Sequence, residues 1–243
     1  MHNQTDEALG DSAVSRLAFA TILAMLLAAC APMNVKQVDR LSTVEENPRI
    51  LLMPPDIRYY LLTAGGVPEP NAEWTEAAQA NFTAAATAYA ASIGSQLKVL
   101  DKRDLSPTEV DYEELHSAVG FTIRDNYFDN PLPGKNGQFD WSLGPGISEI
   151  GANREADYAL FVYYRDYQAS GGRVAFAVLA VALGGGADVG SESGFASLVD
   201  LRTGDVVWFN EVVAGSGELR DKEGAASAVR TLFKDIPTNT AEE

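Results

Sequence analysis

The sequence predicts an α/β fold, a single layered domain with a mixed β-sheet flanked by helices. Short apolar runs at residues 49–54 and 97–100 enclose a long segment with helical spacing. Residues 156–164 are largely apolar at both odd and even positions, as in a central strand that is covered on two faces. A glycine turn at residues 202–204 then separates two strand-like runs. Strands that alternate with long helices and end in a hairpin are typical of a layered domain with a mixed sheet.

The first strand and the first long helix follow from their apolar patterns. The run 49–54 ends in Pro54-Pro55, which predicts a buried strand, and residues 57–62 form a second extended piece. After Pro68, Pro70 and Asn71, apolar residues recur at three- and four-residue spacings, which predicts a helix with one face on the core. These residues are Trp74, Ala78, Phe82, Ala85, Tyr89, Ile93 and Leu97. A short strand is expected near residues 97–100.

The start of the second helix is predicted by a capping box, Ser106-Pro107-Thr108-Glu109, with proline at the first helical position. This helix is expected to run through Tyr112, Leu115, Val119 and Ile123. A loop rich in glycine and proline follows at residues 129–146, and a short helix is predicted at residues 147–154.

The second half begins with the predicted central strand at 156–164, after which Gly171-Gly172 are expected to break the chain. Residues 174–183 are rich in alanine and predict a helix, with a hairpin strand as the alternative. Strands are predicted at 194–201 and 205–213, because Val206, Trp208 and Val212 alternate after the turn. A final helix is predicted at 218–234.

The only cysteine, Cys30, ends the sequence Leu27-Ala28-Ala29-Cys30, which follows Arg16 and an apolar run at residues 17–26. This pattern resembles the lipobox signal of bacterial lipoprotein precursors. The apolar run is shorter than the ~20 residues that a membrane-spanning helix needs, which favours a cleaved signal. The alternative is an ordinary thiol in an uncleaved N-terminal anchor. Residues 1–13 contain three acidic residues and no basic one, whereas the start of a secretory signal is normally basic. Translation that starts near Val14 is therefore also compatible with the sequence.

The lipoprotein resemblance implies cleavage before Cys30 and acylation of its sulfur and new amino group with palmitate-type chains. The predicted organisation is a signal peptide at 1–29, a lipidated tether at 30–47 and one α/β domain at 48–243. Two or three acyl chains anchor a protein stably, whereas one does so only marginally. Because Ala31 follows Cys30, the resemblance implies an outer-membrane location with the domain on the periplasmic face.

The charge of the chain excludes some partners. Without residues 1–29, the chain has 31 acidic and 17 basic residues, a net charge of −14. Nucleic acid and anionic lipid surfaces are themselves negative, so we expect neither to attract the domain. With Cys30 acylated, no disulfide can form, and the core must hold the fold.

A second resemblance concerns two strands. The residues Ala156, Asp157 and Leu160, followed by a hairpin pattern, are similar to those of the curli-secretion and penicillin-binding-protein-activator lipoproteins. The hairpin residues are Leu198, Val199, Asp200, Leu201, Thr203, Gly204, Val206, Val207 and Trp208. This resemblance implies a subunit of an envelope secretion or surface-assembly complex. The chain lacks recognisable transmembrane-hairpin segments, which a curli-type pore would require.

The sequence offers little catalytic chemistry. His116 is the only histidine after the signal, so a metal site built on imidazoles lacks partners, and we expect His116 on a helix surface or partly buried. The stretch 190–194 has Glu192 where a nucleophile elbow needs serine. Gly184-Gly185-Gly186 lacks the spacing of a phosphate-binding loop. We therefore expect no enzyme activity, no cofactor and no metal.

Binding residues are sought among loop acids and aromatics. Asp125, Asp129 and Asp140 could contact calcium or serve a hydrolase, although turn-stabilising hydrogen bonds are the simpler interpretation. Phe139 and Trp141 lie in the glycine- and proline-rich loop and are the predicted recognition residues. The remaining conspicuous aromatics could line a ligand groove, but most lie in predicted strands, where packing in the core is the default: Tyr59, Tyr60, Tyr163, Tyr164, Tyr167 and Trp208.

The sequence thus favours a lipid-anchored envelope lipoprotein that acts as a non-catalytic binding or scaffolding module in the periplasm. Its expected partners are the membrane, through Cys30, and an envelope protein. The first alternative is a subunit of an envelope secretion or surface-assembly complex, to which the apolar segment 174–183 could contribute by packing on a neighbour or on the membrane surface. The second is a carboxylate-dependent hydrolase built on residues 125–140.

Overall fold

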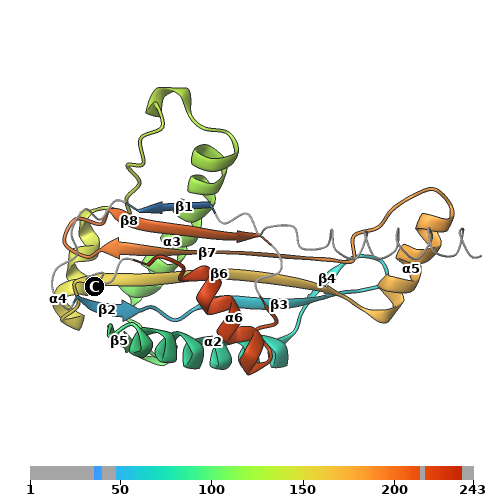
Figure 1. Cartoon of the computed structure of the whole chain (residues 1–243), viewed down its shortest axis with the longest axis horizontal. Coiled ribbons are helices and arrows are strands. Elements are labelled where there is room, and N and C mark those ends of the chain that lie inside the picture. The colour runs from blue at the N-terminus through green and yellow to red at the C-terminus, as the bar shows by residue number, and fades with distance from the viewer. Residues whose placement is uncertain (1–35, 40–47, 214–216, 237–243) are drawn as a thin grey trace, which may run out of the picture. The chain divides into compact units, whose positions relative to one another are not determined.

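A computed structural model describes residues 36–39, 48–213 and 217–236 of the chain. The predicted signal peptide, Cys30 and most of the predicted tether therefore lie outside the described residues. The described residues form one α/β unit with a mixed sheet (Figure 1). None of its helices is both long enough and apolar enough to cross a membrane.

The sheet contains eight strands in the order β1-β8-β7-β6-β2-β5, with β3 also paired to β6 and β4 to β3. The pairs β2–β5, β2–β6 and β3–β6 are parallel, and the other pairs are antiparallel. The strands span Lys36–Asp39 (β1), Arg49–Leu52 (β2), Asp56–Leu62 (β3), Pro68–Pro70 (β4), Gln96–Val99 (β5), Tyr158–Ala169 (β6), Gly190–Asp200 (β7) and Val206–Val213 (β8).

The long strand β6 organises the sheet, because β2 and β3 pair with it one after the other along the same edge. Ile50 of β2 lies opposite Tyr158, and Asp56 of β3 lies opposite Tyr163. The chain passes from β2 to β3 through Pro54-Pro55, which cannot donate ladder hydrogen bonds.

Helices cover both faces of the sheet. They span Ala72–Ser92 (α2), Pro107–Ile123 (α3), Ser148–Arg154 (α4), Gly171–Ala182 (α5) and Lys222–Leu232 (α6). Short turns of other helix types lie at Lys102–Asp104, Arg124–Asp129, Pro133–Lys135 and Pro145–Ile147. Helices α2 and α6 pack on one face, and α3 with the 139–150 segment packs on the other.

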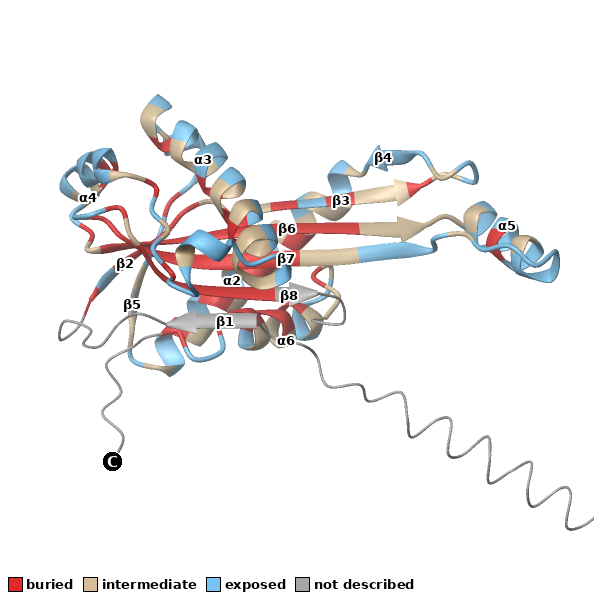
Figure 2. Ribbon diagram, turned by 90° about the horizontal axis from the view of Figure 1, so that it is seen from above, coloured by how far each residue is buried: buried red, intermediate tan, exposed pale blue. Residues whose placement is uncertain are grey.

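The alternation of β6 divides its side chains between two cores. Leu160 and Tyr164 belong to the core under α2 and α6, whereas Phe161 and Tyr163 belong to the core under α3. Figure 2 shows the central strands buried over most of their length. The expectation that residues 156–164 form a strand covered on two faces is therefore confirmed.

The helix starts follow local capping chemistry. The Asn71 side chain accepts a hydrogen bond from the Trp74 backbone amide at 3.0 Å, which sets the start of α2. In α3 the predicted capping box is present, because Ser106 and Glu109 each accept the other's backbone amide. Both helices thus begin where the sequence predicts.

The segment after β6 is a helix, and the hairpin-strand alternative for residues 174–183 is wrong. Strand β6 continues to Ala169, five residues beyond its predicted end, and α5 begins at Gly171. The two glycines do not break the chain there, because the Ser170 side chain caps the helix by accepting from the Arg173 amide at 3.2 Å.

Three local features were not predicted. Residues 36–39, expected to be part of a tether, form strand β1, which pairs antiparallel with β8. Residues 68–70, expected only to precede a helix, pair with β3 as the short strand β4. Residues 124–129 continue α3 as a turn of π-helix before the predicted loop.

Candidate functional site

A cavity of about 680 Å³ lies beside the start of β3, between α2 and α3. It occupies the place where the sheet edge changes from β2 to β3. Pro54-Pro55 form part of its wall, and the other walls come from the first turns of α2 and from one side of α3. Tyr60 and Tyr163 add aromatic surface. We call this space the β3 cavity.

The β3 cavity contains a carboxylate held by two arginines. Arg165 donates from Nη2 to Asp56 Oδ2 at 2.6 Å and from Nη1 to the Asp56 carbonyl oxygen at 2.6 Å. Arg58 donates from Nε to Asp56 Oδ1 at 3.1 Å. The Arg165 guanidinium also lies 4.0 Å from the centre of the Tyr163 ring. Arg165 is nearly buried, whereas Arg58 is largely exposed, so the pair presents one fixed and one accessible guanidinium.

Helix α3 adds a carboxyl group with an altered acidity. Burial raises the pKa of Glu113 to about 7, and the nearby Lys102 opposes part of this rise. The Oε1 atom of Glu113 is buried and has no hydrogen-bond partner among the described residues. Near neutral pH this side chain therefore exists in both protonation states, and it can donate or accept a hydrogen bond in the cavity.

The backbone of β3 beside the cavity is already hydrogen-bonded by α2. The Tyr59 amide donates to Thr75 Oγ1 at 3.0 Å, and Gln79 Nε2 donates to the Ile57 carbonyl at 3.1 Å. The Asn71 amide donates to the Tyr59 carbonyl at 2.9 Å. A bound molecule therefore cannot extend the sheet at these groups, and recognition has to use side chains.

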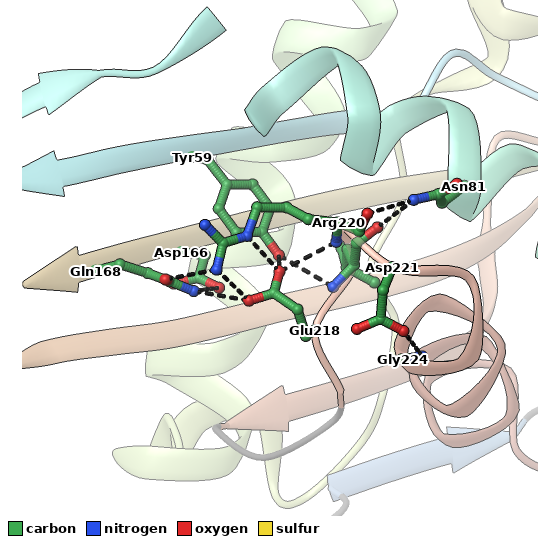
Figure 3. Close-up of polar contacts among 9 residues, drawn as sticks. Tyr59, Asn81, Asp166, Gln168, Glu218, Arg220, Asp221 and Gly224 are labelled. Carbon is green, nitrogen blue, oxygen red and sulfur yellow. Dashed lines mark hydrogen bonds and ion pairs between the residues drawn. The ribbon is translucent and has the colours of Figure 1, made fainter. Parts of the chain in front are cut away.

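A second polar cluster lies on the opposite face of the sheet, under α2 (Figure 3). Glu218 accepts from Arg220 Nε at 2.7 Å, from Gln168 Nε2 at 3.1 Å and from the Tyr59 hydroxyl at 3.2 Å. Asn81 on α2 donates to the Arg220 carbonyl at 2.8 Å. These bonds tie the segment before α6 to β3, β6 and α2, so this cluster holds the fold together.

The two carboxyl groups of the second cluster, Glu218 and Asp166, have pKa values shifted in opposite directions. The Arg220 guanidinium lowers the pKa of Glu218 to about 2, and it stacks 4.4 Å from the Trp74 ring centre. Burial raises the pKa of Asp166 to about 6, with Glu192 and Glu218 adding to the rise. Burial also raises the pKa of the Tyr59 hydroxyl, which stays protonated as a donor to Glu218.

The two predicted recognition residues occupy different environments. Phe139 is 7% exposed and belongs to the core under α3, so it is not available to a ligand. Trp141 is partly buried against the same core, and Lys135 Nζ lies 4.2 Å from its ring centre. The loop folds back on the sheet, and its apolar side chains pack in the core under α3. The sequence pattern of the loop does not predict this packing. Neither residue lines the β3 cavity.

The three loop acids are spread over exposed positions. Asp125, Asp129 and Asp140 are all exposed, and Asp140 forms an ion pair with Lys135. Among residues 36–39, 48–213 and 217–236, no three His, Cys, Asp or Glu side chains lie close enough to hold a metal ion. All three carboxyl groups are exposed to solvent, and none of them lines the β3 cavity.

The expectation that His116 lies on a helix surface or is partly buried is wrong. Its side chain is 3% exposed, its ring stacks on Phe161 at 4.8 Å between centroids, and its Nε2 lies 2.9 Å from Ser197 Oγ. Burial lowers the pKa of His116 to about 3, so the ring is neutral. The hydroxyl of Ser197 compensates the burial of the polar ring, and this partner lies 81 positions away in the sequence.

The charged residues of the β3 cavity were not predicted, whereas Tyr60 and Tyr163 were among the aromatics considered for a ligand groove. Arg165 directly follows the apolar run predicted as a strand at 156–164, and Glu113 is an ordinary acidic position on α3. The one local signal was Pro54-Pro55, which marks the change from β2 to β3. Cys30, the predicted lipidation site, lies outside the described residues.

Comparison with known proteins gives structural likeness alone. No protein-family model and no curated protein matches the chain. Its structure is similar to the PelC dodecamer from Paraburkholderia phytofirmans, with a TM-score of 0.38, 10% identity, and 82% of this chain and 94% of that chain covered. It is also similar to a DUF4136 family protein from Bacteroides thetaiotaomicron (TM-score 0.32, 12% identity, 84% and 95% covered) and to a lipoprotein from Neisseria meningitidis (TM-score 0.30, 13% identity, 77% and 98% covered). At this level of likeness we infer no shared function.

Proposed function

We propose that this chain is a lipid-anchored, non-catalytic binding or scaffolding module of the cell envelope. Acylated Cys30 holds it on the periplasmic face of the outer membrane, and the β3 cavity binds a segment of an envelope protein. The observation that carries the binding role is the cavity itself, in which tyrosine rings stand beside a carboxylate already held by Arg58 and Arg165.

The composition of the β3 cavity suits a protein segment. Tyrosine and arginine are the residue types enriched at energetically important positions of protein interfaces. Tyr60 stacks on Tyr167 with ring centres 4.7 Å apart, so its ring is held rigidly in place. The cavity lining also includes the exposed cations Arg58 and Lys102 and the acids Glu113 and Glu114. A polypeptide carrying both charge signs matches this mixed lining better than a strongly charged ligand does.

Photo-crosslinking in cells tests the binding role. Val110 lines the β3 cavity and is 39% exposed, and Leu115 lies on the same helix outside the cavity and is 40% exposed. A photoreactive residue in place of Val110 should trap one discrete envelope protein, and the same residue at Leu115 should not. Equal crosslinking from both positions, or none from position 110, would contradict the proposal.

The anchor is tested by replacing Cys30 with serine. Serine cannot carry the thioether-linked lipid, so the Cys30→Ser protein should leave the membrane fraction that retains the natural chain. The measurement is fractionation in high salt, which removes electrostatic attachment, together with the intact mass of the natural protein. An unmodified thiol on the mature chain would refute lipid anchoring.

The assembly-subunit alternative predicts a different oligomeric state from this proposal. A subunit of a ring-forming complex runs as a discrete multimer in detergent solution, whereas a binding module of this kind runs as a monomer until its partner is added. Sedimentation of the detergent-extracted chain separates the two.

A further inference from the structure

Helix α5 presents apolar side chains to solvent over almost its whole length. It connects β6 to β7 beyond the part of the sheet that α2, α3 and α6 cover (Figures 1 and 2). Within α5 only Ala177 is buried. The large exposed side chains on the helix and just after it are Val174 (46%), Phe176 (50%), Val178 (66%), Leu179 (58%), Val181 (66%) and Leu183 (79%).

The exposed side chains surround α5 instead of forming a single stripe. At 100° per residue, Val174, Val178 and Val181 share one side of the helix. Phe176 and Leu179 lie on the opposite side. A protein neighbour covers one side of a helix, whereas a helix that is apolar all round is typical of one surrounded by an apolar medium. The distribution therefore favours the acyl chains of a bilayer over a second copy of the chain.

The charge around α5 also differs from that of the whole molecule. The chain carries a formal net charge of −16, yet no acidic residue occurs between Asp166 and Asp188. Arg173 is the one charged residue of α5, and its Nε donates to the Asp188 carbonyl at 2.8 Å. The segment can thus approach a membrane surface without the repulsion that the rest of the domain experiences.

The sheet register places the entry of the chain on the same side as α5. Strand β1 begins at Lys36, which pairs with Glu211 of β8, and Glu211 pairs with Phe195 of β7. Strand β7 begins at Gly190, next to the α5 connection, so the start of β1 lies only about 17 Å along the strand direction from that end of β7. Six residue steps separate Cys30 from Lys36, and they span about 20 Å at most. Acyl chains on Cys30 therefore hold the membrane within reach of α5.

We propose that α5 inserts into the leaflet that holds the acyl chains of Cys30 and forms a second membrane attachment. This proposal rests on the proposed function, because it takes Cys30 as acylated. At 12 residues α5 is about 18 Å long, which is too short to span a bilayer, so it enters one leaflet only. Two attachments fix the orientation of the domain on the membrane, which a lipid on a tether alone does not.

Depth-dependent fluorescence quenching on the full chain tests the proposal. Because Cys30 is the only cysteine, Val178→Cys places a single free thiol on the acylated protein for an environment-sensitive dye. Leu115→Cys on α3 provides the matched control. In vesicles of phosphatidylethanolamine and phosphatidylglycerol, a nitroxide on the acyl chains should quench the dye at position 178 several-fold more than at position 115. Adding Leu179→Asp and Val181→Asp should reduce quenching at position 178 to the control level.

The outcomes separate this proposal from the proposed function. Intact mass of the same sample reports acylation of Cys30. An acylated protein with no excess quenching at position 178 overturns the insertion of α5 and leaves the anchor standing. Energy transfer between dyes at position 178 of two copies, without nitroxide quenching, would assign α5 to a contact between copies. This result would also overturn the insertion of α5. An unmodified Cys30 overturns both proposals.

Discussion

Neighbouring residues of β6 meet very different electrostatic surroundings. Arg165 points into the β3 cavity and is neutralised by Asp56 at 2.6 Å. Asp166 points to the opposite face, where the cation Arg220 is already engaged by Glu218. Because neighbouring side chains of a strand point to opposite faces, Arg165 has a partner of opposite charge, whereas Asp166 is costly to ionise. Burial raises the pKa of Asp166 to about 6.

Asp166→Asn should therefore stabilise the protein near pH 7. In the unfolded chain the pKa of the carboxyl is 3.8, so at pH 7 folding buries an ionised group that prefers water. Removing the charge while keeping the shape should raise the free energy of unfolding by about 1–2 kcal/mol after allowing for solvent screening. Chemical denaturation measures the change. The exposed Asp111→Asn on α3 is the control and should alter stability by less than about 0.5 kcal/mol, so equal effects would contradict this account.

At the residue scale, sequence reasoning failed where the deciding partner is distant in the chain. His116 has the polarity of a surface residue, but Ser197 of β7 supplies a hydroxyl 2.9 Å away in the core. Phe139 lies in a loop rich in glycine and proline, yet this loop returns to the sheet and buries the ring. The core expectation is confirmed for Tyr59 and Trp208, whereas Tyr60 and Tyr167 are only partly buried.

At the element scale, local patterns predicted the strands and helices that carry their own signals. The capping box of α3 and the apolar spacing of α2 depend only on residues three or four positions apart. The short edge strands β1 and β4 were missed, because the first is polar and the second contains two prolines, and both exist through pairing with a distant strand. The β3 cavity was missed for the same reason, since it arises where β2 and β3 share the edge of β6.

The packing of α3 on the sheet depends on a glycine. A Cβ atom at Gly120 would lie 2.1 Å from Phe195 Cε2, and Phe195 is fully buried. Alanine gains up to about 1 kcal/mol in helix propensity, whereas forcing α3 from the sheet costs about 1–3 kcal/mol or more. We expect Gly120→Ala to destabilise the protein by about 2 kcal/mol in thermal or chemical unfolding.

The matched control for Gly120→Ala is Gly171→Ala in the first turn of α5. A Cβ there meets no atom within 4 Å, so propensity acts alone and the variant should gain about 0.5 kcal/mol. If both variants changed stability in the same direction, close contact with Phe195 would not explain the glycine at position 120.

At the scale of the whole molecule, four groups with shifted pKa values set the dependence of stability on pH. Burial raises the pKa of Glu113 to about 7 and that of Asp166 to about 6. Both groups bind protons more tightly in the folded state, so stability increases as the pH falls through these values. Burial lowers the pKa of His116 to about 3, and Arg220 lowers that of Glu218 to about 2. The stability that these two groups contribute is lost as the pH falls below 6.5 for His116 and below 4.5 for Glu218.

The balance of these groups predicts a stability maximum on the acidic side, at about pH 5. Above pH 6.5 only Glu113 and Asp166 contribute, and both favour folding as protons are added. Between pH 6.5 and 4.5 these two outweigh the single opposing proton of His116. Below pH 4.5 Glu218 joins His116, and the surrounding ion-paired carboxylates lose their charge as well, so stability falls. Thermal unfolding from pH 4 to pH 8 measures the maximum, which Asp166→Asn should move toward neutral pH. A maximum at pH 7 or above in the natural chain would show that Asp166 and Glu113 are not buried with the raised pKa values that this fold imposes.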